Sequence, residues 1–186
     1  MNASTINASI TSSYSALEFI ALILESQRKG QTCLPHNLGL SNANVELLLT
    51  TCNFQPVKDQ LRKQSDEEDT RQDLLEMRLD EWNDVRNLLL ENRANISEYE
   101  VLLAEIVAAA CMGGGHLWHD LGMPNRTGLS DLLNIFFTDL AARNVHDMKW
   151  KKFFYKQLCE KEGAYVCRAP TCGECAAYDD CFGPEE

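Results

Sequence analysis

The chain has 186 residues, 45% of them hydrophobic, and its 17 basic and 28 acidic side chains give a net charge of −11. This length is sufficient for one domain that buries most of its apolar surface without the help of a metal or a disulfide. The acidic excess argues against nucleic-acid binding, because the phosphate backbone would repel such a chain. Five of the eight cysteines fall within the last 28 residues, and this uneven distribution is the first feature to explain.

Apolar residues spaced three and four apart predict helices along most of the chain. Capping boxes of the form S-x-x-E begin at Ser15, Ser65 and Ser97. The predicted helices cover residues 17–27, 45–51, a stretch from 65 through 89, 101–111, 116–121, 130–143 and 147–162. No segment alternates apolar and polar residues long enough to predict a strand. We therefore expect an all-α fold, with a helical domain over residues 1–158 and an irregular cysteine-rich tail, residues 159–186, packed on it as one domain overall.

The cysteine distribution and the N-terminal sequence together predict the compartment. The first apolar stretch, residues 16–24, is interrupted by Glu18, is too short to cross a bilayer and lacks the flanks of a secretory signal. Secreted disulfide scaffolds are usually small and cysteine-rich throughout, whereas only Cys33, Cys52 and Cys111 precede the tail. We expect a cytoplasmic protein with reduced thiols and no membrane contact, in which these three cysteines are small buried hydrophobes.

The tail carries the spacing C-x4-C-x2-C-x5-C, formed by Cys167, Cys172, Cys175 and Cys181. Glycines and prolines interrupt this stretch, so we expect a loop on which four thiolates can converge on one soft metal centre. C-x4-C-x2-C is the triplet spacing of plant-type iron–sulfur proteins, in which a fourth cysteine comes later. Structural zinc usually takes two C-x2-C pairs, and only one is present here. An iron–sulfur centre is favoured, with zinc and disulfides as the alternatives.

The helix that leads into the tail is basic. Residues 143–168 hold seven basic and three acidic groups, a net charge of +4, whereas the remaining 10 basic and 25 acidic residues give −15. On a helical wheel Lys149, Lys152 and Lys156 lie opposite the aromatic face, and Cys159 falls beside Lys152. This basic side can attract an oxyanion, hold an anionic cluster or contact an acidic partner, and a solvated helix face is the alternative. Cys159 is expected off the core face, either near the tail or as a partly exposed inert thiol.

Two motifs carry a resemblance to a known family: DMKWKKFFYKQLC at residues 147–159, followed by the cysteine spacing above, and HLWxDLG at residues 116–122. Both resemble the NifQ family, the molybdenum-handling proteins of nitrogenase cofactor assembly. The resemblance covers residues 110–186, and the first hundred residues fit only as a generic helical region.

The resemblance implies a non-catalytic carrier of an oxygen-sensitive molybdenum–iron–sulfur cluster, which donates molybdenum to the iron–molybdenum cofactor. The implied partners are the nitrogenase cofactor scaffold, the Fe protein, and molybdate or another molybdenum source. Residues carried over by motif match are the cluster ligands Cys167, Cys172, Cys175 and Cys181, together with Cys159 and His116 as an additional ligand or a neighbour of the metal. A zinc-stabilised helical interaction module and an iron–sulfur electron carrier are the alternative functions.

Molybdate is a hard oxyanion, which a purely thiolate site binds poorly. The lysines of the basic helix offer initial attraction to such an anion. Backbone amides of residues 113–115, a run of three glycines, offer a second element of an anion site. A helix C-terminus also explains these glycines without any ligand, and the sequence favours that interpretation.

Overall fold

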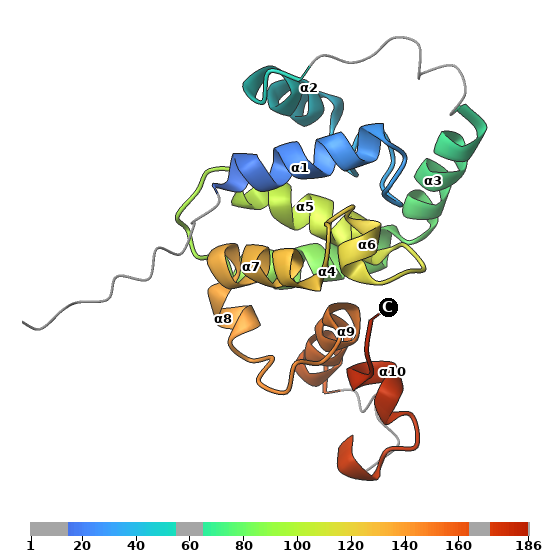
Figure 1. The fold of residues 1–186 in the computed structure, drawn as a ribbon, viewed down its shortest axis with the longest axis vertical. Helices are drawn as coiled ribbons and strands as arrows, with labels where there is room; N and C mark the ends of the chain where they lie inside the picture. The colour runs from blue at the N-terminus through green and yellow to red at the C-terminus, as the bar shows by residue number, and fades with distance from the viewer. Residues whose placement is uncertain (1–14, 55–64, 164–171, 186) are drawn as a thin grey trace, which may run out of the picture.

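The computed structural model describes residues 15–54, 65–163 and 172–185, and every regular element in this part of the chain is helical (Figure 1). The helices are α1 (Ala16–Arg28), α2 (Asn42–Thr51), α3 (Ser65–Met77), α4 (Leu79–Glu91), α5 (Glu100–Cys111), α6 (Leu117–Asp120), α7 (Arg126–Phe136), α8 (Thr138–Ala141), α9 (Trp150–Lys161) and α10 (Tyr178–Phe182), with a 3-10 turn η1 (Cys172–Glu174). This confirms the predicted all-α class. None of the described helices combines the length and the apolar character that a membrane crossing requires.

The central element of the fold is α5. Its sequence, EVLLAEIVAAAC, is apolar on all sides, and ten of its twelve residues are buried. A helix that is hydrophobic all round must be enclosed by others, and α5 contacts α1, α4 and α6 (Figure 1). Its C-terminal end leads directly into the glycine run of residues 113–115.

The predicted capping boxes form in two ways. At Ser15 the box is complete: the hydroxyl oxygen accepts the N–H of Glu18, and the Glu18 carboxylate accepts the N–H of Ser15. At Ser97 the hydroxyl oxygen instead accepts the N–H of Tyr99, while the fully buried Glu100 carboxylate accepts three consecutive backbone N–H groups, those of residues 95–97. The side chains of the box predicted at Ser65 lie outside the described residues.

Two predicted helices are each divided in the structure. The stretch from residue 65 through 89 forms α3 and α4, which meet at Arg78 with a φ of −113°. The Arg78 guanidinium donates to the Met112 carbonyl, so this break is tied to a contact far along the sequence. The segment predicted as residues 130–143 begins earlier, at the Asn125 N-cap, and is divided into α7 and α8 at Phe137, whose side chain is fully buried. Neither break has a glycine or a proline to mark it.

The basic helix α9 packs on α4. Trp150, Phe153 and Phe154 are all buried, which confirms the wheel. The tail is less irregular than predicted, because a 3-10 turn and the short α10 form within it. Phe182 and Cys181 of α10 pack against the hydrophobic core, so this part of the tail is held against the helical body. Figure 1 shows α10 beside α9.

Candidate functional site

The cysteines of the tail lie on one short segment. Cys172 opens η1 and is exposed, Cys175 directly follows η1, and its N–H donates to the Cys172 carbonyl at 3.2 Å. Residues three apart in a 3-10 turn lie on the same side, so this turn places the C-x2-C pair as two neighbouring thiols. Cys181 is half-buried on α10, which contacts η1. Cys167, the fourth predicted ligand, lies outside the described residues.

The described residues alone do not assemble a metal centre. Within residues 15–54, 65–163 and 172–185, no three His, Cys, Asp or Glu side chains come close enough together to hold a metal ion. The structure thus positions three of the four predicted cysteines on the tail, and the ligand set stays a prediction.

The tail is fixed to the start of α9 through Lys149. The backbone N–H of Lys149 donates to the Cys181 carbonyl at 2.8 Å, and its ammonium group donates to the Asp179 carbonyl at 2.8 Å. Lys149 is also the N-cap residue of α9. One residue therefore connects the basic helix to the helix that carries Cys181.

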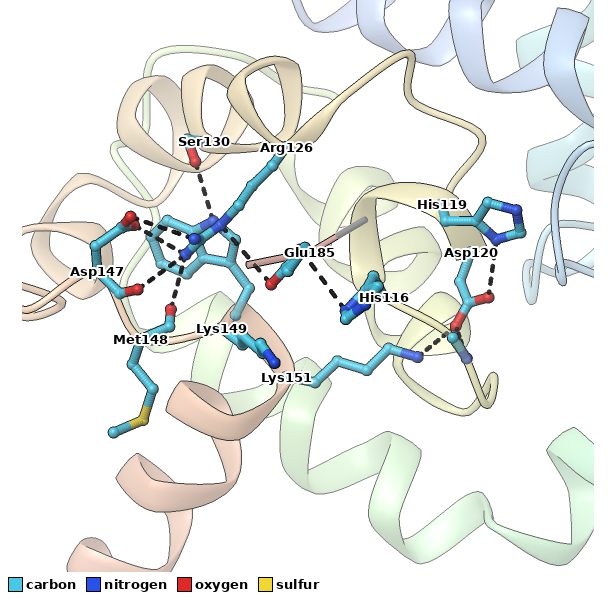
Figure 2. Close-up of polar contacts among 12 residues, drawn as sticks. His116, His119, Asp120, Arg126, Ser130, Asp147, Met148, Lys149, Lys151 and Glu185 are labelled. Carbon is cyan, nitrogen blue, oxygen red and sulfur yellow. Dashed lines mark hydrogen bonds and ion pairs between the residues drawn. The ribbon is translucent and has the colours of Figure 1, made fainter. Parts of the chain in front are cut away.

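Glu185 makes a second connection between the tail and the helical body. Its side chain, only 5% exposed, lies between His116 and Arg126, with carboxylate oxygens 3.8 Å from His116 Nδ1 and 3.8 Å from Arg126 Nε (Figure 2). His116 is the N-cap of α6, and Arg126 opens α7. The remaining guanidinium nitrogens of Arg126 are bonded to Asp147 and to the Met148 carbonyl. His116, which the sequence singled out, is thus beside a carboxylate of the tail.

A buried ion pair joins α9 to the glycine turn. Lys151 Nζ donates to the Asp120 carboxylate at 2.5 Å and to the Gly113 carbonyl at 2.8 Å, and the same carboxylate accepts the N–H of Gly115 at 2.9 Å (Figure 2). The side chains of Asp120 and Lys151 are 6% and 15% exposed. This pairing was not predicted from the sequence. One signal was available: Lys151 lies three residues before the buried Phe154, on the edge of the aromatic face.

The glycine turn has no room for larger residues at its first position. A Cβ atom on Gly113 would lie 2.5 Å from both Asp120 Oδ2 and Cys33 Sγ, whereas one on Gly114 would meet no atom within 4 Å. Close packing around the ion pair therefore requires glycine at residue 113. The helix C-terminus interpretation of the run holds, since the N–H of Gly113 donates to the Ala110 carbonyl.

A cavity of about 330 Å³ lies between this glycine turn and the first turn of α9. Its basic lining residues are Arg78, Lys149, Lys151 and Lys152. Its acidic lining residues are Glu81, Asp180 and Glu185. The side chains of His116 and Tyr155 complete the polar lining. Residues of the helical body and of the tail thus form one small polar cavity.

The structure separates the three lysines that the helical wheel placed together. Lys149 and Lys152 line the cavity. Lys156 is not among its described lining residues and forms an ion pair with Glu160 one turn along the helix, at 3.7 Å. Cys159, half-buried near the end of α9, is likewise not among them.

The thiols before the tail differ in burial. Cys111 is buried, as predicted, whereas Cys33 and Cys52 are only half-buried, so the prediction was wrong for these two. Burial raises the pKa of Cys111 to about 12, and burial together with the Asp120 charge raises that of Cys33 to about 12. These thiols are therefore protonated and unreactive at neutral pH.

A second and wider cavity, of about 810 Å³, lies against the same turn. Its described lining includes Gly113 and Gly114, together with Cys33, His119 and Asp120. Much of the remainder of its lining is apolar and comes from α1, α3, α5 and the loops beside them. The turn after α5 thus borders both cavities.

Comparison with known proteins identifies the family. The NifQ family model matches residues 19–183. Protein NifQ of Azotobacter vinelandii is 49% identical over 168 residues, which are 88% of this chain and 86% of that protein. The protein NifQ homolog of Sinorhizobium fredii is 43% identical over 102 residues, 55% of this chain and 44% of the homolog. Protein NifQ of Rhodobacter capsulatus is 43% identical over 83 residues, 45% of this chain and 46% of that protein. No solved structure matches.

These matches extend the resemblance beyond the two motifs that first carried it. The family model begins in α1 and ends just after α10, so it includes the helical region before residue 110 as well as the glycine turn, α9 and the tail. Because the match spans most of the chain, and the Azotobacter relative is similar over nearly its full length, the chain belongs to the NifQ family.

Proposed function

We propose that this chain carries a molybdenum–iron–sulfur cluster and supplies molybdenum for assembly of the nitrogenase iron–molybdenum cofactor. The observation that carries the proposal is membership of the NifQ family over residues 19–183, a span that includes the whole C-x4-C-x2-C-x5-C spacing. The chain then acts as a carrier and donor in the cytoplasm rather than as a catalyst.

The proposed cluster ligands are Cys167, Cys172, Cys175 and Cys181. Thiolates are the ligands that iron–sulfur clusters take from proteins. The tail geometry supports this role, because the 3-10 turn pairs Cys172 with Cys175, and α10 holds Cys181 against the body. Cys172 is exposed, which leaves one edge of the centre accessible to a receiving protein. Cys159 and His116 are proposed as an additional ligand or as neighbours of the metal.

The proposed partners follow from cofactor assembly. The cofactor scaffold and the Fe protein would receive molybdenum, and molybdate or another molybdenum source would load the chain. Exchange with a partner requires an accessible centre, and most described residues of the segment 172–180 are exposed.

Anaerobic purification followed by elemental analysis tests the proposal. We expect iron and molybdenum in the protein, and X-ray absorption at both metal edges should show sulfur ligands. Zinc near one equivalent with neither iron nor molybdenum would contradict the carrier function and favour a zinc-stabilised interaction module. A reversible one-electron couple in protein that never binds molybdenum would favour an electron carrier.

Substitution of single cysteines tests the ligand set. Cys175→Ala should lose iron and molybdenum while far-UV circular dichroism stays unchanged, because the helical core does not depend on this thiol. Cys52→Ala is the matched control, since Cys52 is also half-buried but lies at the end of α2, outside the tail. Equal metal loss in both variants, or unfolding of the helices in Cys175→Ala, would contradict the assignment.

A further inference from the structure

The polar cavity between the glycine turn and α9 differs in its lining from the described cysteines of the tail. Its described lining includes residues of the tail, Asp180 and Glu185, but not Cys172, Cys175 or Cys181. At about 330 Å³ it has room for roughly ten water molecules, at about 30 Å³ each. A small ion can therefore enter it with part of its hydration shell.

Two of the four basic groups in the cavity are already neutralised. The Arg78 guanidinium forms an ion pair with Glu81 at 2.6 Å, and Lys151 forms the buried pair with Asp120. Each of these two cations has a carboxylate at short distance, so the two ion pairs add little net charge for the attraction of an anion.

The other two basic groups keep their charge. The ammonium group of Lys149 donates to the neutral carbonyl of Asp179 and has no carboxylate within ion-pair distance in the described part of the chain. Lys152 is exposed and forms neither a hydrogen bond nor an ion pair with any described residue. Both lysines line the cavity, where their charges attract an anion.

An unpaired donor lies at the same place. The hydroxyl oxygen of Tyr155 is buried and has no hydrogen bond of satisfactory geometry with a described residue. Burial, and then the interaction of the hydroxyl with the adjacent Glu81 carboxylate, raise the pKa of Tyr155, so this hydroxyl stays protonated at neutral pH. An oxygen atom of a ligand would compete with Glu81 for its proton. A buried polar group without a partner has a free-energy cost, which an oxygen atom of a ligand would remove.

We propose that this cavity binds a small tetrahedral oxyanion, with Lys149 and Lys152 supplying positive charge and the Tyr155 hydroxyl a hydrogen bond. Hard N–H and O–H donors suit the oxygen atoms of such an anion, in contrast to the thiolates of the tail. The inference rests on the proposed function in one respect: it takes the anion to be molybdate, the oxyanion of the metal that the chain is proposed to supply. In this arrangement one chain offers an oxygen-binding and a sulfur-binding site close together in the fold.

Two lining carboxylates, those of Asp180 and Glu185, oppose the anion and lower its affinity. Glu185 is the more deeply buried of the two. Its carboxylate lines the cavity and is held at 3.8 Å from His116 and from Arg126, longer than a direct hydrogen bond. An entering dianion would be repelled by this fixed negative charge. Removal of the Glu185 charge should therefore strengthen oxyanion binding, whereas removal of the lysine charges should weaken it.

Titration of the full-length, metal-free protein with molybdate at low ionic strength tests the proposal, with bound molybdenum measured after equilibrium dialysis. Lys149→Gln combined with Lys152→Gln should weaken binding roughly tenfold, because each lost charge contributes a modest free energy to a partly exposed site. Tyr155→Phe should weaken it about fivefold, the effect of one hydrogen bond. Glu185→Gln should tighten it several-fold. Lys161→Gln, at the far end of the same helix, is the matched control and should leave binding unchanged.

Equal binding by the wild type and the double lysine variant would overturn the proposal, as would absence of molybdate binding by the wild type. Sulfate that competes as strongly as molybdate would support an oxyanion site and overturn molybdate as its preferred anion. Iron content, measured on separately loaded protein, distinguishes this failure from failure of the carrier function. If the cluster loads normally while the lysine variants bind molybdate as the wild type does, only the cavity proposal fails. If molybdate binds as expected but iron never does, only the carrier function fails.

Discussion

The ion pair between Lys151 and Asp120 offers the sharpest test of how α9 is held against the glycine turn. Lys151→Met keeps most of the aliphatic side chain and removes its charge. The variant loses a charge-assisted hydrogen bond to Asp120, a contribution of about 1.5–3 kcal/mol, and one to the Gly113 carbonyl, about 0.5–1.5 kcal/mol. The Asp120 carboxylate, on a side chain that is 6% exposed, keeps the N–H of Gly115 as a donor and has His119 Nδ1 at 3.8 Å. We expect a loss of about 2–4 kcal/mol in the free energy of unfolding.

Urea denaturation followed by far-UV circular dichroism measures this loss. At a slope of about 2 kcal/mol per molar urea, a loss of 3 kcal/mol lowers the midpoint by about 1.5 M. Lys161→Met is the control, because Lys161 and Glu91 also form a short ion pair, at 2.6 Å, but both side chains are more than half exposed. Exposed pairs contribute about 0–1 kcal/mol, so this variant should unfold close to the wild-type midpoint.

A double-mutant cycle separates the pair from its surroundings. Asp120→Asn preserves an acceptor for Gly115 and removes the negative charge, so the double variant with Lys151→Met should lose about 1–3 kcal/mol less than the sum of the single variants. If Lys151→Met were no more destabilising than Lys161→Met, the reasoning from burial would be refuted.

Three further predictions concern the glycine turn and the thiols. Gly113→Ala should destabilise the protein by about 1–3 kcal/mol, because the new Cβ would overlap Asp120 Oδ2. Gly114→Ala is the control, since its Cβ would meet no atom within 4 Å, and it should unfold near the wild-type midpoint. Equal midpoints for the two variants would contradict the close packing at residue 113. Iodoacetamide at pH 8 should alkylate the exposed Cys172 of metal-free protein and spare Cys111, whose pKa is raised to about 12, as mass spectrometry of the digested protein would show. The Cys111 thiol ionises near pH 9.0 in the unfolded chain but only near pH 12 in the folded one. The free energy of unfolding should therefore fall as pH rises from about 9 toward 12. A denaturation midpoint that stays flat over that range would contradict the raised pKa.

Local patterns in the sequence were enough to predict where most of the helical segments lie and where α1 and α5 begin. The box at Ser15 forms as written, and the aromatic face of α9 is buried as its spacing required. Both features depend on residues within one or two turns of each other, and this is the range over which capping and amphipathic patterns act. Residue types alone also predicted the all-helical class, because no segment has the two-residue period of a strand.

Features fixed by distant contacts could not be predicted in the same way. The break at Arg78 is tied to a carbonyl 34 residues later, and the division at Phe137 accompanies complete burial of that ring. The partner of Lys151 lies 31 residues earlier in the sequence, so a helical wheel could show only that this lysine borders the buried face. For the tail, the cysteine spacing predicted a shared site, but the spacing contains no information on Glu185 or on the cavity that it lines.

The enclosure of α5 has a consequence for how the protein moves. Backbone amides of a helix buried on all sides exchange with solvent only when the whole domain unfolds, so α5 should be the slowest-exchanging segment in a deuterium-exchange experiment. The glycine turn comes shortly after α5 and its Gly115 N–H donates to Asp120, so we expect this amide to be protected from exchange as well. The opposite wall includes Asp180 and Glu185, on a short helix and the segment that follows it. Because these residues lie on a short helix and the segment after it, we expect their backbone amides to exchange faster than those of α5.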